Sequence, residues 1–134
     1  MNKYRIIWID DQREPARPIN WKDVIPSEFA DLLKNEQPQI IWLQGFQSWI
    51  NWAKKNWFGN KNEKYIDCIC LDHDLGDFDK NGKEYTGVDV AKTIVNDVLN
   101  YDKKLPFYEC HSSNPSGKEN ILSIFESYQK YLIL

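Results

Sequence analysis

Three short apolar runs in this sequence each stop abruptly at polar side chains, and this pattern limits the possible folds more than any other feature. Apolar runs of this length are typical of buried strands. Charged groups packed against the end of a buried strand are costly, so they need a chemical reason to be there. The runs are Tyr4 to Ile9 before Asp10-Asp11, Ile66 to Leu71 before Asp72-His73-Asp74, and Phe107 to Cys110 before His111-Ser112-Ser113-Asn114.

Segments with helical spacing separate these runs, and a further strand is expected at Gln39 to Leu43. Strand followed by helix, four times over, predicts parallel βαβ units with right-handed crossovers. The expected fold is a three-layer α/β sandwich of the flavodoxin type, with a parallel sheet of four or five strands. Because parallel strands bring their carboxyl ends to one edge, the polar residues should meet there, where such folds place their ligands.

Length and composition indicate one soluble domain over residues 1–134, with 42% hydrophobic and 28% charged residues. The net charge of −3 does not favour extended nucleic-acid binding. No apolar run is long enough to span a bilayer, and no signal-peptide pattern opens the chain, so a cytoplasmic location is expected. Three cysteines cannot all pair, and buried free thiols are expected. The oligomeric state stays open.

Acidic residues after two neighbouring strands predict a metal site. Asp10, Asp11, Asp72 and Asp74 would converge at the edge, and clustered carboxylates must either protonate or bind a cation. Oxygen-only ligands suit a divalent metal, and Mg²⁺ is the expected ion. The alternative is that Asp10 and Asp72 only cap turns and bind nothing.

Both histidines of the chain, His73 and His111, follow strand ends at the same expected edge. Imidazole is the usual general acid or base near neutral pH, so they are candidate catalytic groups together with Asp72, in an order that the sequence does not assign. The alternative is that each ring only hydrogen-bonds to a loop carbonyl.

Phosphate-binding groups are expected around the same edge. Arg13 lies close behind the first acids, and a turn rich in small donors leads into a helix at Pro115. Backbone N–H groups at a helix N-terminus bind phosphate readily. Neither of the common glycine-rich nucleotide motifs is present. The candidates in this turn are Ser112, Ser113 and Asn114.

Two segments remain ambiguous. Residues 77–86 read as a polar loop, and Asp77 to Gly82 matches the first half of a calcium loop. The twelfth position of that loop would be Val88, where a glutamate is needed, so a solvated turn is the better interpretation. Tyr131 to Leu134 fits either a short fifth strand or the end of the last helix.

Several of these motifs resemble the receiver domains of two-component signalling. Asp10-Asp11 and Asp72 match the acids that hold Mg²⁺ in receivers, with Asp72 at the phosphoacceptor position. Thr86-Gly87-Val88 resembles the start of the receiver's following helix, and Ser112 or Ser113 falls where receivers keep a Ser or Thr.

The differences between this sequence and receiver domains are typical of one receiver-derived group. The lysine that receivers carry after a fifth strand is missing, whereas Asp72-His73-Asp74 and His111-Ser112-Ser113-Asn114-Pro115 are additions. Together they closely resemble the cyclic-phosphate-processing receiver domains. The resemblance implies a metal-assisted phosphoesterase for a cyclic or terminal phosphate of a nucleotide or RNA end. The alternatives are a phosphoacceptor module using Asp72 and a non-catalytic binding module.

Overall fold

The computed structural model describes residues 4–15, 20–59 and 66–133, with side chains described as far as Gln129. Strands and helices alternate along most of the chain, and three strands follow one another between residues 68 and 86. The strands are β1 (Arg5–Ile9), β2 (Gln39–Leu43), β3 (Cys68–Leu71), β4 (Asp74–Phe78), β5 (Glu84–Thr86) and β6 (Phe107–Cys110). The helices are the 3₁₀ turn η1 (Trp21–Asp23), α1 (Ser27–Leu33), α2 (Phe46–Asn56), α3 (Gly87–Tyr101) and α4 (Pro115–Ile133).

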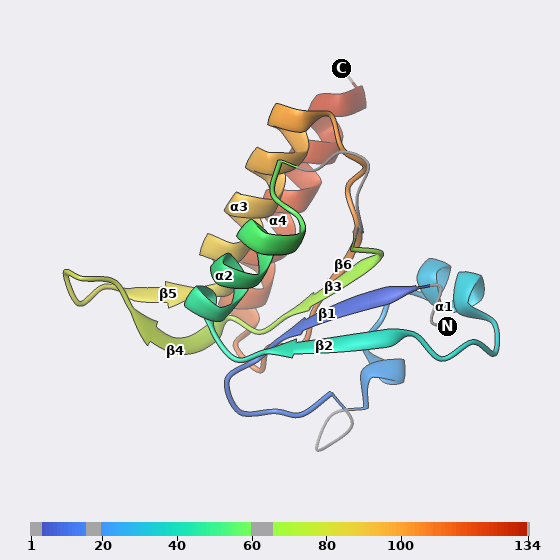
Figure 1. Cartoon of the computed structure of the whole chain (residues 1–134), viewed down its shortest axis with the longest axis horizontal. Helices are drawn as coiled ribbons and strands as arrows, with labels where there is room; N and C mark the ends of the chain where they lie inside the picture. The colour runs from blue at the N-terminus through green and yellow to red at the C-terminus, as the bar shows by residue number, and fades with distance from the viewer. Residues whose placement is uncertain (1–3, 16–19, 60–65, 134) are drawn as a thin grey trace.

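Four strands form one parallel sheet in the order β2-β1-β3-β6 (Figure 1). The backbone ladder continues into the first polar residue after each of three strands. Asp10 N donates to Leu43 O at 3.1 Å, Asp72 N to Ile9 O at 2.9 Å, and His111 N to Leu71 O at 3.0 Å. The polar strand ends are therefore fixed at one edge of the sheet. The fold is an α/β sandwich of the receiver-like, flavodoxin type, as predicted.

Helices cover the two faces of the sheet unequally. On one face, Ile7, Ile9 and the matching residues of β3 pack against α2, α3 and α4. On the other face, Ile6 and Trp8 pack against α1 and η1. Alternate side chains of a strand point to opposite faces, so β1 contributes to both cores.

The three cysteines are free and buried, as predicted. Hydrogen bonding with Cys70 and burial raise the pKa of Cys68 far above its ordinary value. Burial raises the pKa of Cys110 to about 11. Because the thiolate is the reactive form, Cys68 and Cys110 should be unreactive at neutral pH.

The prediction of a polar loop over residues 77–86 is confirmed for the turn at residues 79–83 and is wrong for the strand residues on either side of it. β4 and β5 pair in an antiparallel hairpin, with Asp74 opposite Thr86 and Phe78 opposite Glu84. Asp79 Oδ1 accepts hydrogen bonds from the N–H groups of Asn81 and Lys83, which closes the turn. Only Leu75 of β4 is buried, so neither strand carries the apolar run by which a strand is recognised in sequence.

The last helix settles the second ambiguous segment. α4 continues to Ile133, so residues 131–133 are helical rather than a fifth strand, and Leu134 lies outside the described residues. Within the described part of the chain, no helix is both long and apolar enough to cross a membrane.

Candidate metal and phosphate site

Three carboxylates converge where β1 and β3 end. Asp10 and Asp11 follow β1, and Asp72 follows the neighbouring strand β3. Each offers an oxygen, and these atoms all lie within 4.8 Å of one another. Asp10 is fully buried, Asp72 is 7% exposed, and Asp11 is half-buried. Three hard oxygen ligands at this spacing fit a divalent cation such as Mg²⁺.

No described lysine or arginine balances the negative charge of this cluster. Among the described residues, no lysine or arginine forms an ion pair with any of the three carboxylates. Burial, together with repulsion from Asp10, Asp72 and Asp74, raises the pKa of Asp11. A bound cation would relieve this repulsion, so the residues present fit a metal ion.

Asp10 is held in place from three directions. Its Oδ1 accepts the N–H groups of Gln12 and Arg13, both at 2.9 Å. Its Oδ2 accepts Nε2–H of His111 at 2.9 Å. Burial alone would raise the pKa of Asp10, but these hydrogen bonds outweigh it and lower the pKa. Asp10 is therefore a fixed carboxylate, ionised at neutral pH.

The His111 ring lies inside the protein. Its side chain is 2% exposed, and it stacks on the Trp8 indole with ring centroids 4.1 Å apart and planes 9° apart. The strand between them, β3, places the small Cys70 level with Trp8, which leaves space for this contact. Nδ1 of His111 is buried and has no hydrogen-bond partner among the described residues.

His73 has a different environment. Its backbone N–H donates to Asp72 Oδ1 at 2.8 Å, which ties it to the cluster. Its Nδ1 hydrogen-bonds to Asp74 Oδ1 at 2.8 Å, and the ring packs on Gly117 in the first turn of α4. A Cβ at Gly117 would lie 2.4 Å from His73 Cγ, so only glycine allows this packing. The His73 side chain is 18% exposed.

Asp74 does not join the group of three carboxylates. Its side chain is 61% exposed and serves as the partner of His73. It still adds to the negative charge near Asp11. A carboxylate on Nδ1 favours the imidazole tautomer with Nε2 unprotonated.

Arg13 joins the loop after β1 to the loop after β6. Its two terminal nitrogens donate to His111 O and to Ser113 Oγ, both at 3.2 Å. Ser112 Oγ accepts Asn114 N–H at 3.1 Å, and Asn114 Oδ1 accepts Gly117 N–H at 3.0 Å. Ser112 and Asn114 thus shape the turn and cap α4, whereas the Arg13 guanidinium connects this turn to the loop after β1.

The hairpin of β4 and β5 forms one wall of the site. Gly76 has a φ of +75°, and a Cβ there would lie 2.8 Å from Asp11 Oδ2. The Asp77 carboxylate accepts the N–H groups of Phe46 and Gln47 and so caps α2. Asp77 therefore caps α2 and Asp79 closes the hairpin turn, and among the described residues neither belongs to a group of side chains that could hold a metal ion.

Comparison with known proteins gives the same family as the motifs. Residues 5–127 match the family described as the cyclic-phosphate processing receiver domain. The chain belongs to this family. No curated protein and no solved structure shows a significant match. This member of the family has the three-carboxylate cluster, the buried His111 and the hairpin wall described above.

Sequence reasoning missed the residues that support the site. Trp8 stacks on His111, and the Trp42 indole donates to Asp10 O at 2.7 Å. Gly76 and Gly117 make room for Asp11 and His73. The position of Trp8 two residues before the acids was a usable signal. The glycines gave none, because their neighbours are distant in sequence.

Proposed function

We propose that this domain is a metal-dependent phosphoesterase acting on a cyclic or terminal phosphate of a nucleotide or RNA end. The observation that supports it most is the cluster of Asp10, Asp11 and Asp72, whose ligand oxygens lie within 4.8 Å of one another and pair with no lysine or arginine among the described residues. Membership in the cyclic-phosphate processing family supports the substrate class.

Asp10, Asp11 and Asp72 would hold Mg²⁺. The ion would neutralise charge on the phosphate oxygens and orient the ester. Arg13, fixed by His111 O and Ser113 Oγ, would supply a second positive charge to the same phosphate. At the start of α4, the N–H groups of Gly117 and Lys118 already donate to Asn114, so the N–H of Ser116 is the one that would be offered to the phosphate.

The two histidines take different roles in this proposal. Opening a cyclic phosphate forms a P–O bond to water and breaks a P–O bond to a ribose oxygen. The water loses a proton and the ribose oxygen gains one. His73 moves a proton at one of these oxygens, because Asp74 holds its Nδ1 and no described residue hydrogen-bonds to its Nε2. His111 is a positioning residue, since its buried Nε2 is bound to Asp10.

The test is ³¹P NMR of the protein with Mg²⁺ and a 2′,3′-cyclic nucleotide. The wild type should convert the cyclic ester to a monoester, whereas Asp72→Asn and a sample with EDTA should not. His73→Gln should lower the turnover rate and leave Mg²⁺ binding, measured by calorimetry, unchanged.

An unchanged spectrum with the wild type would contradict the proposal. In that case acetyl phosphate and intact-mass analysis would test the phosphoacceptor alternative. A mass gain of one phosphoryl group that Asp72→Asn abolishes would support a signalling module.

A further inference from the structure

The hairpin of β4 and β5 projects beyond the carboxyl edge of the parallel sheet (Figure 1). It is fixed to the body at two places. Asp77 Oδ1 and Oδ2 accept the N–H groups of Phe46 and Gln47 at 3.2 and 3.0 Å. Tyr85 stacks on Phe46 with ring centroids 4.1 Å apart. The hairpin therefore has a defined position relative to the site.

The two faces of β4 have different surroundings. Leu75 is buried and Asp77 faces α2, whereas Asp74, Gly76 and Phe78 are exposed. A Cβ at Gly76 would meet the Asp11 carboxylate. The positive φ of Gly76 and the irregular pairing between Asp74 and Phe78 interrupt the regular alternation of side chains along β4. Phe78 follows two residues after Gly76, so its Cα lies at most roughly 7 Å from that of Gly76.

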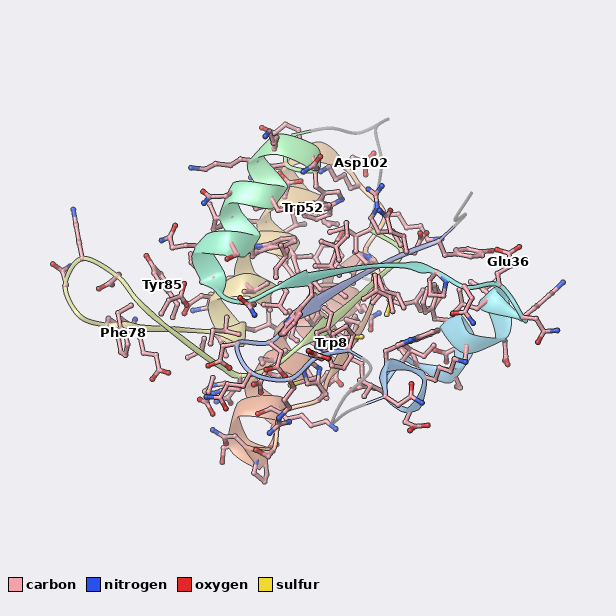
Figure 2. The ribbon with its side chains drawn as sticks, turned by 60° about the horizontal axis from the view of Figure 1, so that its bottom comes forward. Trp8, Glu36, Trp52, Phe78, Tyr85 and Asp102 are labelled. Carbon is pink, nitrogen blue, oxygen red and sulfur yellow. The ribbon has the colours of Figure 1, made fainter. Side chains whose placement is uncertain are left out.

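Phe78 is also the most exposed large apolar side chain among the described residues, at 59%. In Figure 2, Tyr85 lies on the α2 side of the hairpin and Phe78 on the side away from it. Single exposed apolar residues are common on protein surfaces, so exposure alone says little. Here the exposed ring belongs to the same strand as Gly76, which meets the Asp11 carboxylate of the candidate phosphate site.

We infer that Phe78 is a stacking platform for the nucleobase of the substrate. This inference rests on the proposed function and narrows it to phosphate esters that carry a base. A phenyl ring has no hydrogen-bonding groups, and every base has a π-face. The site should therefore accept all four bases with similar affinity and discriminate against sugar phosphates that lack a base.

Calorimetric titration in Mg²⁺ tests this, with adenosine 2′-monophosphate and ribose 5-phosphate as probes. The wild type should bind the nucleotide more tightly than the sugar phosphate. Phe78→Ala should weaken nucleotide binding by about tenfold and leave ribose 5-phosphate unchanged. Phe78→Tyr keeps the ring and should bind as the wild type does. Leu32→Ala, which removes an exposed apolar side chain on α1, should change neither affinity.

Three outcomes would overturn the inference. The wild type could bind both probes equally, Phe78→Ala could weaken both equally, or Phe78→Ala could weaken neither. If ribose 5-phosphate still binds and Asp11→Asn abolishes its binding, the phosphate site stands and only the base platform fails. If neither probe binds the wild type in Mg²⁺, the proposed function fails, and the inference fails with it.

Discussion

Nε2–H of His111 donates to Oδ2 of Asp10 at 2.9 Å, between side chains that are 2% and 0% exposed. The first carboxylate of the cluster is thus oriented from the side that solvent does not reach. The Trp8 indole, stacked on the imidazole, fixes the donor in turn. Asp10 should keep its orientation whether or not a metal is bound.

Substitutions of His111 can test its stacking on Trp8 and its hydrogen bond to Asp10 separately. His111→Phe keeps a ring against Trp8 but removes the donor to Asp10. We expect it to lower the free energy of unfolding by about 1–3 kcal/mol in urea titrations, because a buried acceptor loses its partner. His111→Gln keeps an N–H group and should lose less. Equal losses in the two variants would mean that the hydrogen bond to Asp10 contributes little.

Magnesium should stabilise the folded protein. At about ten times its Kd the ion would add about 1.4 kcal/mol, because it binds the folded state alone. The rise in Tm, compared with NaCl of equal ionic strength, measures this. Asp11→Asn should abolish the rise, whereas Asp31→Asn, at an exposed acid of α1, should keep it. A rise that survives Asp11→Asn would place the ion elsewhere.

Two glycines form a matched pair for testing the hairpin wall. Gly76 and Gly82 have φ values of +75° and +81°, so alanine at either should cost about 1–2 kcal/mol of stability. Only at Gly76 would the new Cβ meet Asp11 Oδ2, since nothing lies within 4 Å at Gly82. Gly76→Ala should therefore also weaken Mg²⁺ binding, measured by calorimetry. Equal Mg²⁺ affinity in both variants would contradict the contact with Asp11.

Asp67 gives a pH-dependent prediction away from the site. Burial raises its pKa above the ordinary 3.8, although its Oδ2 accepts Arg5 N–H at 2.8 Å. A raised pKa means that the folded state favours the neutral acid. Its contribution to stability is complete below pH 3.8 and is lost as the pH rises through the folded-state pKa.

Asp67→Asn keeps an acceptor oxygen and removes the charge. The variant should therefore be more stable than the wild type at neutral pH, and the difference should disappear below pH 3.8. Urea titrations at several pH values measure this. A variant that is less stable at neutral pH would show that the carboxylate charge favours the folded state.

The main sheet could be predicted from the sequence because its strands are apolar runs that end in polar residues. The backbone bonds of Asp10, Asp72 and His111 continue the ladders of those runs, so chain order alone brings them together. The hairpin could not be predicted, because β4 and β5 pair only with each other and bury one residue of β4.

The sequence predicted which residues form the site better than it predicted how their side chains are placed. The grouping of Asp10, Asp11 and Asp72 follows from the order of the strands, and it is present. The different environments of the histidines do not follow from sequence. Whether a ring is buried depends on contacts such as Trp8 with His111 or Gly117 with His73, which only the folded chain brings together.

Two consecutive residues of β4 contact different parts of the protein, and this limits which insertions and deletions the strand can accept. Gly76 makes room for Asp11, and the next residue, Asp77, caps a helix that begins about thirty residues earlier in the chain. A length change before Phe78 would shift the wall of the site and uncap α2 together. The exposed turn Lys80 to Lys83 hydrogen-bonds to Asp79 within the hairpin, and none of its described contacts reaches α2 or the carboxylates, so it is where a tag, a label or a grafted loop should be tolerated.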